Sequence, residues 1–106
     1  MIRAETKHLI DRAVYDEQHY AVTEKPLFHS DHEAWAVLEE EIEEAEIECI
    51  AIENWMEDLW VAIKNEEAPY EEVNELIKHA KLLAAEAIQV AAVGEKFFLR
   101  KGEKNE

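Results

Sequence analysis

The longest regular pattern in the chain is a stripe of apolar residues whose members are spaced alternately by three and four positions. Such spacing places side chains along one side of an α-helix. The members are Trp35, Leu38, Ile42, Ala45, Cys49, Ile52, Met56, Leu59 and Ile63. Neither Gly nor Pro occurs between Ser30 and Glu67. We therefore expect one long helix, with a bend near Asn54 as the alternative. Ser30 followed three residues later by Glu33 matches a capping box and predicts the start of this helix.

A second long helix is expected after Ala68. Pro69 suits the first helical position, and the acidic Glu71 and Glu72 suit the positive end of the helix dipole. The expected core side of this helix is again spaced by threes and fours, with Val73, Leu76, Ile77, Ala80, Leu83, Ala84, Ala87 and Ala91. Gly94 is expected to thin the packing or loosen the end of the helix.

The N-terminal segment, about Ala4 to Val22, has a weaker helical pattern with a short apolar side. The segment 23–29, which contains Pro26, is interpreted as a connection. One weak helix cannot cover the apolar stripes of two long ones, so we expect a second copy of the chain to cover the rest. The prediction is an all-α helical bundle, as a homodimer or tetramer, with a single domain over 1–106. Its parts are an N-terminal helix within 1–24, a core of about 28–101 and a tail at 102–106.

Composition narrows the class of protein. Hydrophobic residues make up 48% of the 106 residues, which favours a folded chain despite a formal charge of −15. That charge repels phosphate backbones and anionic lipid, so we expect neither nucleic acid nor membrane as a partner. No apolar run is long enough to span a bilayer and no signal-peptide pattern is present. The single Cys49 excludes an internal disulfide and favours a reducing, cytoplasmic location.

The acidic run from Glu39 to Glu48 is the first candidate for chemistry. Its simplest interpretation is a solvated helix face, and Glu40 and Glu43 do point away from the apolar stripe. Glu41 lies beside the stripe, and Glu44 follows it one turn later on the same side. Two such carboxylates can share Mg²⁺ if further carboxylates or phosphates complete the coordination.

Glu86 is the second candidate. It is the only acid in the run 80–93, whose apolar composition is typical of a helix buried on most sides. A buried carboxylate needs a hydrogen bond, a charge partner or a metal. Two interpretations remain open: a hydrogen bond to a Tyr, Trp or backbone partner, or a metal shared with Glu41 and Glu44. Gln89 lies one turn further along the same side.

The remaining polar and aromatic residues favour ordinary structural roles. His29 and His32 lie at a helix start without Cys or His partners at zinc spacing, so surface or capping roles are expected. Cys49 is expected in the core. Packing is the default for the tryptophans, although a Trp can also stack on a nucleobase. They are Trp35, Trp55 and Trp60.

The stretch from Phe28 to Phe98 resembles the MazG-like all-α nucleoside triphosphate pyrophosphohydrolases, particularly the small phage and prophage type. The resemblance is carried by Phe-His-Ser-Asp-His-Glu-Ala-Trp-Ala-Val-Leu from Phe28, by Glu-Glu-Ile-Glu-Glu-Ala from Glu40 and by Glu-Ala-Ile-Gln-Val-Ala-Ala from Glu86. The family pattern is Glu-Glu-x-x-Glu on one helix and Glu-x-x-Asp on a later one. The same Glu spacing also occurs at 39/40/43 and 71/72/75, and the resemblance selects 40/41/44.

This resemblance implies Mg²⁺, or alternatively Mn²⁺, bound by Glu41, Glu44 and Glu86. The family's last metal ligand falls on Gln89, whose neutral amide offers one carbonyl oxygen, so we expect weaker metal binding. Glu40 and Glu44 are the implied catalytic carboxylates. The family's basic residue after the second motif falls on Lys96, which would bind the substrate.

The implied reaction is hydrolysis of a nucleoside triphosphate to its monophosphate and pyrophosphate. Mg²⁺ held by carboxylates would bridge the acidic protein to an anionic substrate. Two alternatives stay open. One is a relative that has lost turnover and binds nucleotides or a protein partner. The other is a helical interaction module without a site.

Overall fold

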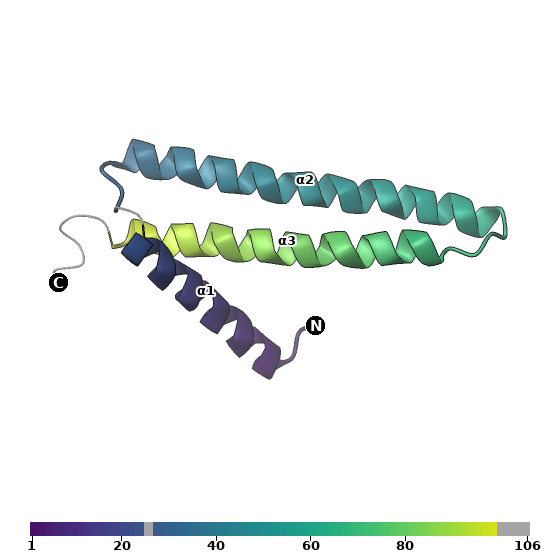
Figure 1. Ribbon diagram of the computed structural model, residues 1–106, viewed down its shortest axis with the longest axis horizontal. Coiled ribbons are helices and arrows are strands. Elements are labelled where there is room, and N and C mark those ends of the chain that lie inside the picture. Colours follow the sequence, from purple (N-terminus) through teal and green to yellow (C-terminus); the bar gives the residue numbers. More distant parts are fainter. Residues whose placement is uncertain (25–26, 100–106) are drawn as a thin grey trace.

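The chain forms three helices, α1 (Ala4–Glu24), α2 (Asp31–Lys64) and α3 (Tyr70–Phe97) (Figure 1). The computed structural model describes residues 1–24 and 27–99, the side chains of 21–24 excepted, and this part contains no β-strand. α2 and α3 form a long antiparallel hairpin, and α1 crosses α3 obliquely near the open end of the hairpin. The prediction of an all-α fold is confirmed.

α2 begins where the sequence predicts. The Ser30 side chain accepts a hydrogen bond from the backbone N–H of Glu33 at 3.1 Å. In return, Glu33 Oε1 accepts from the backbone N–H of His29 at 2.6 Å. The capping box is therefore present, with its return bond one residue upstream of the cap. From there α2 runs uninterrupted for 34 residues, as the single-helix interpretation expects.

A short turn joins α2 to α3. Glu66, with φ of 56°, lies in the left-handed region that lets the chain leave the helix. Pro69 is the cap residue of α3 and not its first helical residue, and its carbonyl accepts from the N–H of Val73 at 3.1 Å. α3 continues past Gly94 to Phe97. At the other end of the chain α1 runs to Glu24, so the connection starts slightly later than predicted, and Pro26 lies outside the described residues.

The core of this single chain is thin. Its buried apolar side chains are mostly small: Val14, Phe28, Ala34, Ala62 and Ala92. Only part of the predicted stripe of α2 turns toward α3, with Leu38, Ala45, Ile52 and Leu59 half-buried. A hairpin measuring 61 × 31 × 22 Å with α1 included therefore exposes much apolar surface.

Several predictions of burial are wrong for the single chain. Cys49 is exposed and not in the core. Trp35 and Trp60 are exposed, whereas Trp55 is half-buried. On α3, Leu76 and Leu83 are half-buried, but the other members of its expected core side are exposed. The reason is common to all of them: each long helix has one neighbour along most of its length, and one neighbour covers only one side.

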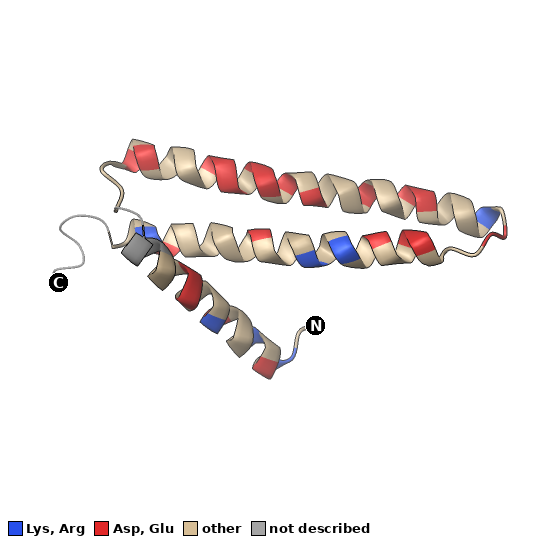
Figure 2. Cartoon of the chain, viewed as in Figure 1, with Lys and Arg blue, Asp and Glu red and all other residues tan. Residues whose placement is uncertain are grey.

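Charge is distributed unevenly over the two long helices (Figure 2). Acidic residues follow one another along the first half of α2, whereas Glu86 is the one charged residue of α3 between residues 82 and 94. None of the described helices combines the length and the apolar character needed to cross a membrane.

Candidate functional site

Glu86 of α3 faces the acidic run of α2. Glu86 is half-buried as a residue, and its carboxyl group forms a hydrogen bond with that of Glu44. Burial is the main cause that raises the pKa of Glu86 above its ordinary value, followed by this hydrogen bond. The negative charges of Glu44, Glu41 and Glu48 raise the pKa further. The predicted trio of Glu41, Glu44 and Glu86 is thus brought to one place, together with Glu48, which the sequence did not single out as a ligand.

The donor set at this place suits a hard divalent cation. Carboxylate oxygens are the ligands that Mg²⁺ and Mn²⁺ prefer, and Mg²⁺ commonly keeps several waters beside one or two carboxylates. Within the described ranges, however, no three acidic, His or Cys side chains are already arranged around a common metal position. The chemistry therefore fits Mg²⁺, while the side chains would have to rotate from their hydrogen-bonded arrangement to hold it.

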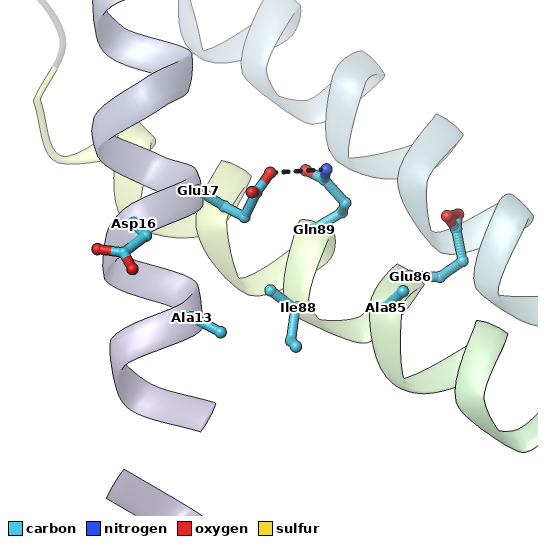
Figure 3. A pocket seen from close by; sticks show the side chains of 7 residues that line it. All are labelled: Ala13, Asp16, Glu17, Ala85, Glu86, Ile88 and Gln89. Atoms are coloured by element: carbon cyan, nitrogen blue, oxygen red, sulfur yellow. Dashed lines mark hydrogen bonds between the residues drawn. The ribbon is translucent and has the colours of Figure 1, made fainter. Parts of the chain in front are cut away.

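Gln89 is engaged with α1. Its Nε2 donates a hydrogen bond to Glu17 Oε1 at 3.1 Å, and Glu86 lies one turn along the same helix (Figure 3). The three side chains share a hollow of about 470 Å³ between α1 and α3. Its full lining is Ala13, Asp16, Glu17, Ala85, Glu86, Ile88 and Gln89. Glu17 was missed by sequence reasoning because the contact spans 72 positions and joins two helices with no shared motif.

Lys96 lies at the open end of the hairpin, beside these acids. It is only 6% exposed, and its Nζ is 4.7 Å from the centre of the Phe28 ring, a cation–π contact. Lys96 and Glu41 line a hollow of about 170 Å³ together with Tyr20, Phe28 and other side chains. This hollow combines a cation, a carboxylate and aromatic rings, which are the groups that a nucleotide needs.

Glu40 lies at the outer edge of the same region. Its side chain is exposed, and it lines a neighbouring hollow of about 320 Å³ that also includes Glu41 and Lys96. Of the two carboxylates predicted to be catalytic, Glu44 is therefore paired with Glu86, and Glu40 faces solvent near Lys96.

Glu48 is held by a histidine that the sequence did not single out. His79 Nδ1 lies 2.7 Å from Glu48 Oε1, and its Nε2 lies 3.6 Å from Glu75 Oε1. Both contacts are partly shielded from solvent. Because His79 engages Glu48 on the side of α2 that faces α3, it fixes the level at which the two helices meet. His29 and His32 are both exposed, which is consistent with the surface or capping roles predicted for them.

The resemblance to the MazG-like enzymes rests on short motifs that lie at the start of α2, in the acidic run and around Glu86. α1, which supplies Glu17 and Tyr20, has no part in it. Comparisons of the chain with protein-family models, with curated proteins and with solved structures found no match. The function is therefore inferred from the residues and contacts described above.

Proposed function

We propose that this protein is a Mg²⁺-dependent nucleoside triphosphate pyrophosphohydrolase, which releases a nucleoside monophosphate and pyrophosphate. The observation that carries the proposal is the hydrogen-bonded pair of Glu44 and Glu86, formed between α2 and α3 beside Glu41. Lys96 and Tyr20 line one hollow with Glu41. Carboxylates for a cation, an ammonium group for phosphate and an aromatic ring for a base thus lie next to one another.

The electrostatics of the chain support a role for a divalent cation. A protein with a formal charge of −15 repels a triphosphate unless cations lie between them. When bound, Mg²⁺ would supply charge neutralisation and a positioned water. The carboxylates of Glu41, Glu44 and Glu86 would hold it, with Gln89 as the predicted fourth ligand.

The chain's own groups supply the remaining steps. Lys96 binds a phosphate oxygen through its ammonium group. Glu40, which is exposed near Lys96 and Glu41, accepts the proton from the attacking water. Tyr20, which is exposed and lines the same hollow, offers a ring face against which a nucleobase can stack. The proposal includes a MazG-like bundle completed by a second copy of the chain, or by more copies.

A second candidate is a catalytically impaired relative that binds nucleotides or a protein partner as a helical module. It is favoured by Gln89, which stands at the position of the family's Asp and donates its amide to Glu17. An amide held in this way contributes no negative charge to a metal site. Under this candidate the hollows beside Lys96 still bind a nucleotide, but no pyrophosphate is released.

Thermal melting across a Mg²⁺ or Mn²⁺ titration tests the metal site. We expect the cation to raise the melting temperature of the wild type and to leave that of Glu86→Gln unchanged. Gln89→Asp should bind the metal more tightly, and without metal its melting temperature should not exceed that of the wild type. Glu43→Gln is the matched control, because this substitution removes the same charge from an exposed position on α2. Parallel shifts in the wild type and Glu86→Gln would end the metal-site interpretation.

Pyrophosphate release from a panel of nucleoside triphosphates, with Mg²⁺ or Mn²⁺, separates the two candidates. Release that is lost in Glu86→Gln and kept in Glu43→Gln supports the hydrolase. Metal-dependent stabilisation of the wild type without release from any nucleotide favours the impaired relative.

A further inference from the structure

α2 leaves one row of large apolar side chains uncovered. These residues, the outer stripe of α2, recur at every seventh position: Trp35, Ile42, Cys49, Met56 and Ile63. Trp35 is 66% exposed and Met56 is 58% exposed, and the other members are exposed as well. A strict seven-residue repeat stays in register with a neighbouring helix that coils around it in the left-handed sense. The outer stripe is therefore suited to packing against another helix.

α3 leaves a matching row of smaller residues uncovered. This alanine stripe of α3 is spaced by fours and threes: Val73, Ile77, Ala80, Ala84, Ala87 and Ala91. All of its members are exposed in the single chain. Between Val73 and Ala91 the stripe carries no charged residue, which is unusual for a surface in a chain as acidic as this one.

The two stripes lie on the same side of the hairpin. Glu48 and His79 face each other across the two helices at 2.7 Å. Cys49 and Ala80 each follow by one residue, which is a rotation of about 100° in an α-helix. Because α2 and α3 are both right-handed and run in opposite directions, equal rotations turn the two side chains toward the same side. The outer stripe and the alanine stripe therefore form one continuous apolar face.

We propose that this face binds the same face of a second copy, with a two-fold axis parallel to the helices. The outer stripe of α2 then packs on the alanine stripe of the partner's α3, and the reverse contact forms symmetrically. Large side chains thus meet small ones along both contacts, which lets them interdigitate. If α2 packed instead on α2 of the partner, large residues would oppose large ones and hold these two helices far apart. The two α3 helices, with alanines opposing alanines, would need to lie closer together than that. The interface does not depend on the proposed hydrolase activity.

The register follows from contacts within one chain. Glu48 lies level with His79, and Glu44 with Glu86, so residue 49 lies level with residues 78–81 of α3. An axis parallel to the helices preserves levels, so Cys49 opposes Ala80 of the partner subunit. Seven residues earlier, Ile42 opposes Ala87 of the partner subunit. A hollow of about 190 Å³ borders Ala87, with almost wholly apolar walls from Ile10, Val14, Ala84, Ile88 and Ala91, and it can receive that isoleucine.

Charge favours the same arrangement. Glu46 and Glu53 border the outer stripe on its side away from α3, and Lys81 borders the alanine stripe on its side away from α2; all three are exposed. With α2 on the partner's α3, Lys81 of the partner subunit lies beside Glu46 and Glu53. With α2 on its own copy, these acids would instead face one another, which is unfavourable.

The face is large enough for a stable dimer. The outer stripe runs about 42 Å along α2 and the alanine stripe about 27 Å along α3, at 1.5 Å per residue. With helices packed about 10 Å apart, the face covers on the order of 700 Å² on each subunit. Stable protein–protein interfaces bury roughly 600–1,000 Å² per partner, so the face lies within this range.

Disulfide trapping tests the arrangement, since Cys49 is the chain's single cysteine. We expect the wild type to sediment as a dimer at micromolar concentration and to form no disulfide-linked dimer under mild oxidation, because the two copies of Cys49 lie diagonally across the bundle. The Ala80→Cys variant should form linked dimers in which peptide mapping finds a bond between positions 49 and 80. Leu82→Cys is the control, because Leu82 is exposed at nearly the same level on the opposite side of α3.

Three outcomes would overturn the proposal. The first is a monomeric wild type. The second is efficient trapping of Cys49 to Cys49 in the wild type, which would mean that α2 packs on α2. The third is equal trapping of Leu82→Cys and Ala80→Cys, which would mean that this face has no preference.

Discussion

Two sides of α2 carry apolar residues, but only one of them is covered within the single chain. The side toward α3 includes half-buried carboxylates, among them Glu41 and Glu48, beside buried alanines. The adjacent flank of α2, about 100° round the helix from the side that faces α3, carries the large apolar residues of the outer stripe, which are exposed. Inside the chain, acids meet α3 together with Leu38, Ile52 and Leu59, which are half-buried. The large apolar residues of the outer stripe are left for another molecule.

The contacts across the hairpin explain why acids can lie on the inner side. A carboxylate that loses water needs a hydrogen bond or a counter-charge. His79 supplies one to Glu48, and Glu86 shares a hydrogen bond with Glu44. These pairs show the level at which the two helices meet, while the free energy available from the large apolar groups of the outer stripe is not used within the chain. A domain of this length commonly needs oligomerisation to bury enough surface.

The largest expected effect comes from placing a charge on the outer stripe. Ile42→Glu should weaken the dimer at least about 100-fold, roughly 2.8 kcal/mol, because the carboxylate would be buried without a partner. Sedimentation equilibrium measures the change, and circular dichroism should show helix content close to that of the wild type. Ile47→Glu is the matched control: Ile47 is 63% exposed, more than Ile42 at 41%, but lies off the stripe. Equal weakening by both variants would contradict a specific face.

On the inner side, overpacking should destabilise the fold itself. Ala34 is 1% exposed, so Ala34→Leu forces extra methyl groups into the packed start of α2. We expect the free energy of unfolding to fall by about 1–3 kcal/mol. Ala36→Leu makes the same change two residues later at an exposed position and should be nearly neutral. Chemical denaturation compares the two variants, and similar midpoints would mean that Ala34 is not packed as described.

The N-terminal cap of α2 affects both sides of the helix, because it fixes the residue at which the helix begins. Ser30→Ala removes the acceptor for the N–H of Glu33 and should cost about 1 kcal/mol. This corresponds to a drop in melting temperature of roughly 4–8 °C in a domain of this size. Ser30→Asp keeps an acceptor and should remain close to the wild type. An unchanged melting temperature in Ser30→Ala would show that the cap is not used.

Periodicity predicted what depends on neighbours along the chain. The helices, the Ser30 cap and the absence of a break in α2 all follow from local spacing and local hydrogen bonds. The same spacing could not tell which part of a broad apolar stripe meets α3, so Cys49 was wrongly assigned to the core. Helix periodicity fixes sides of a helix, and only the packing of two helices decides which side is covered.

The same distinction between local sequence and helix packing applies to the candidate site. Glu41 and Glu44 were identified by their position beside the stripe, and Glu86 by being the lone acid in an apolar run. The contacts of His79 with Glu48 and of Glu17 with Gln89 were not foreseen, because they join positions 31 and 72 residues apart. Nothing in the local sequence marks such pairs. They depend on the level at which α3 meets α2 and on the angle at which α1 crosses α3.

The smallest expected effect concerns the pH dependence of the inner side, measured without divalent cations. The folded state raises the pKa of Glu86, so near that pKa the folded protein binds more protons than the unfolded chain. Stability should therefore fall as the pH rises from the ordinary Glu range through the raised value, and level off above it. Glu86→Gln removes this contribution, so it should melt slightly higher than the wild type at neutral pH and show a flatter pH profile.

The matched control separates this local contribution from general repulsion. A chain with a formal charge of −15 also loses stability with rising pH because all of its carboxylates repel one another. Glu43→Gln removes one of these charges from an exposed position of α2 and should keep the slope of the wild type. Melting curves between about pH 4.5 and 8 in the presence of a chelator compare the three proteins. If Glu86→Gln and Glu43→Gln follow the same pH profile, the pair of Glu44 and Glu86 does not hold a proton, and the inner side of α2 is no different electrostatically from its solvated face.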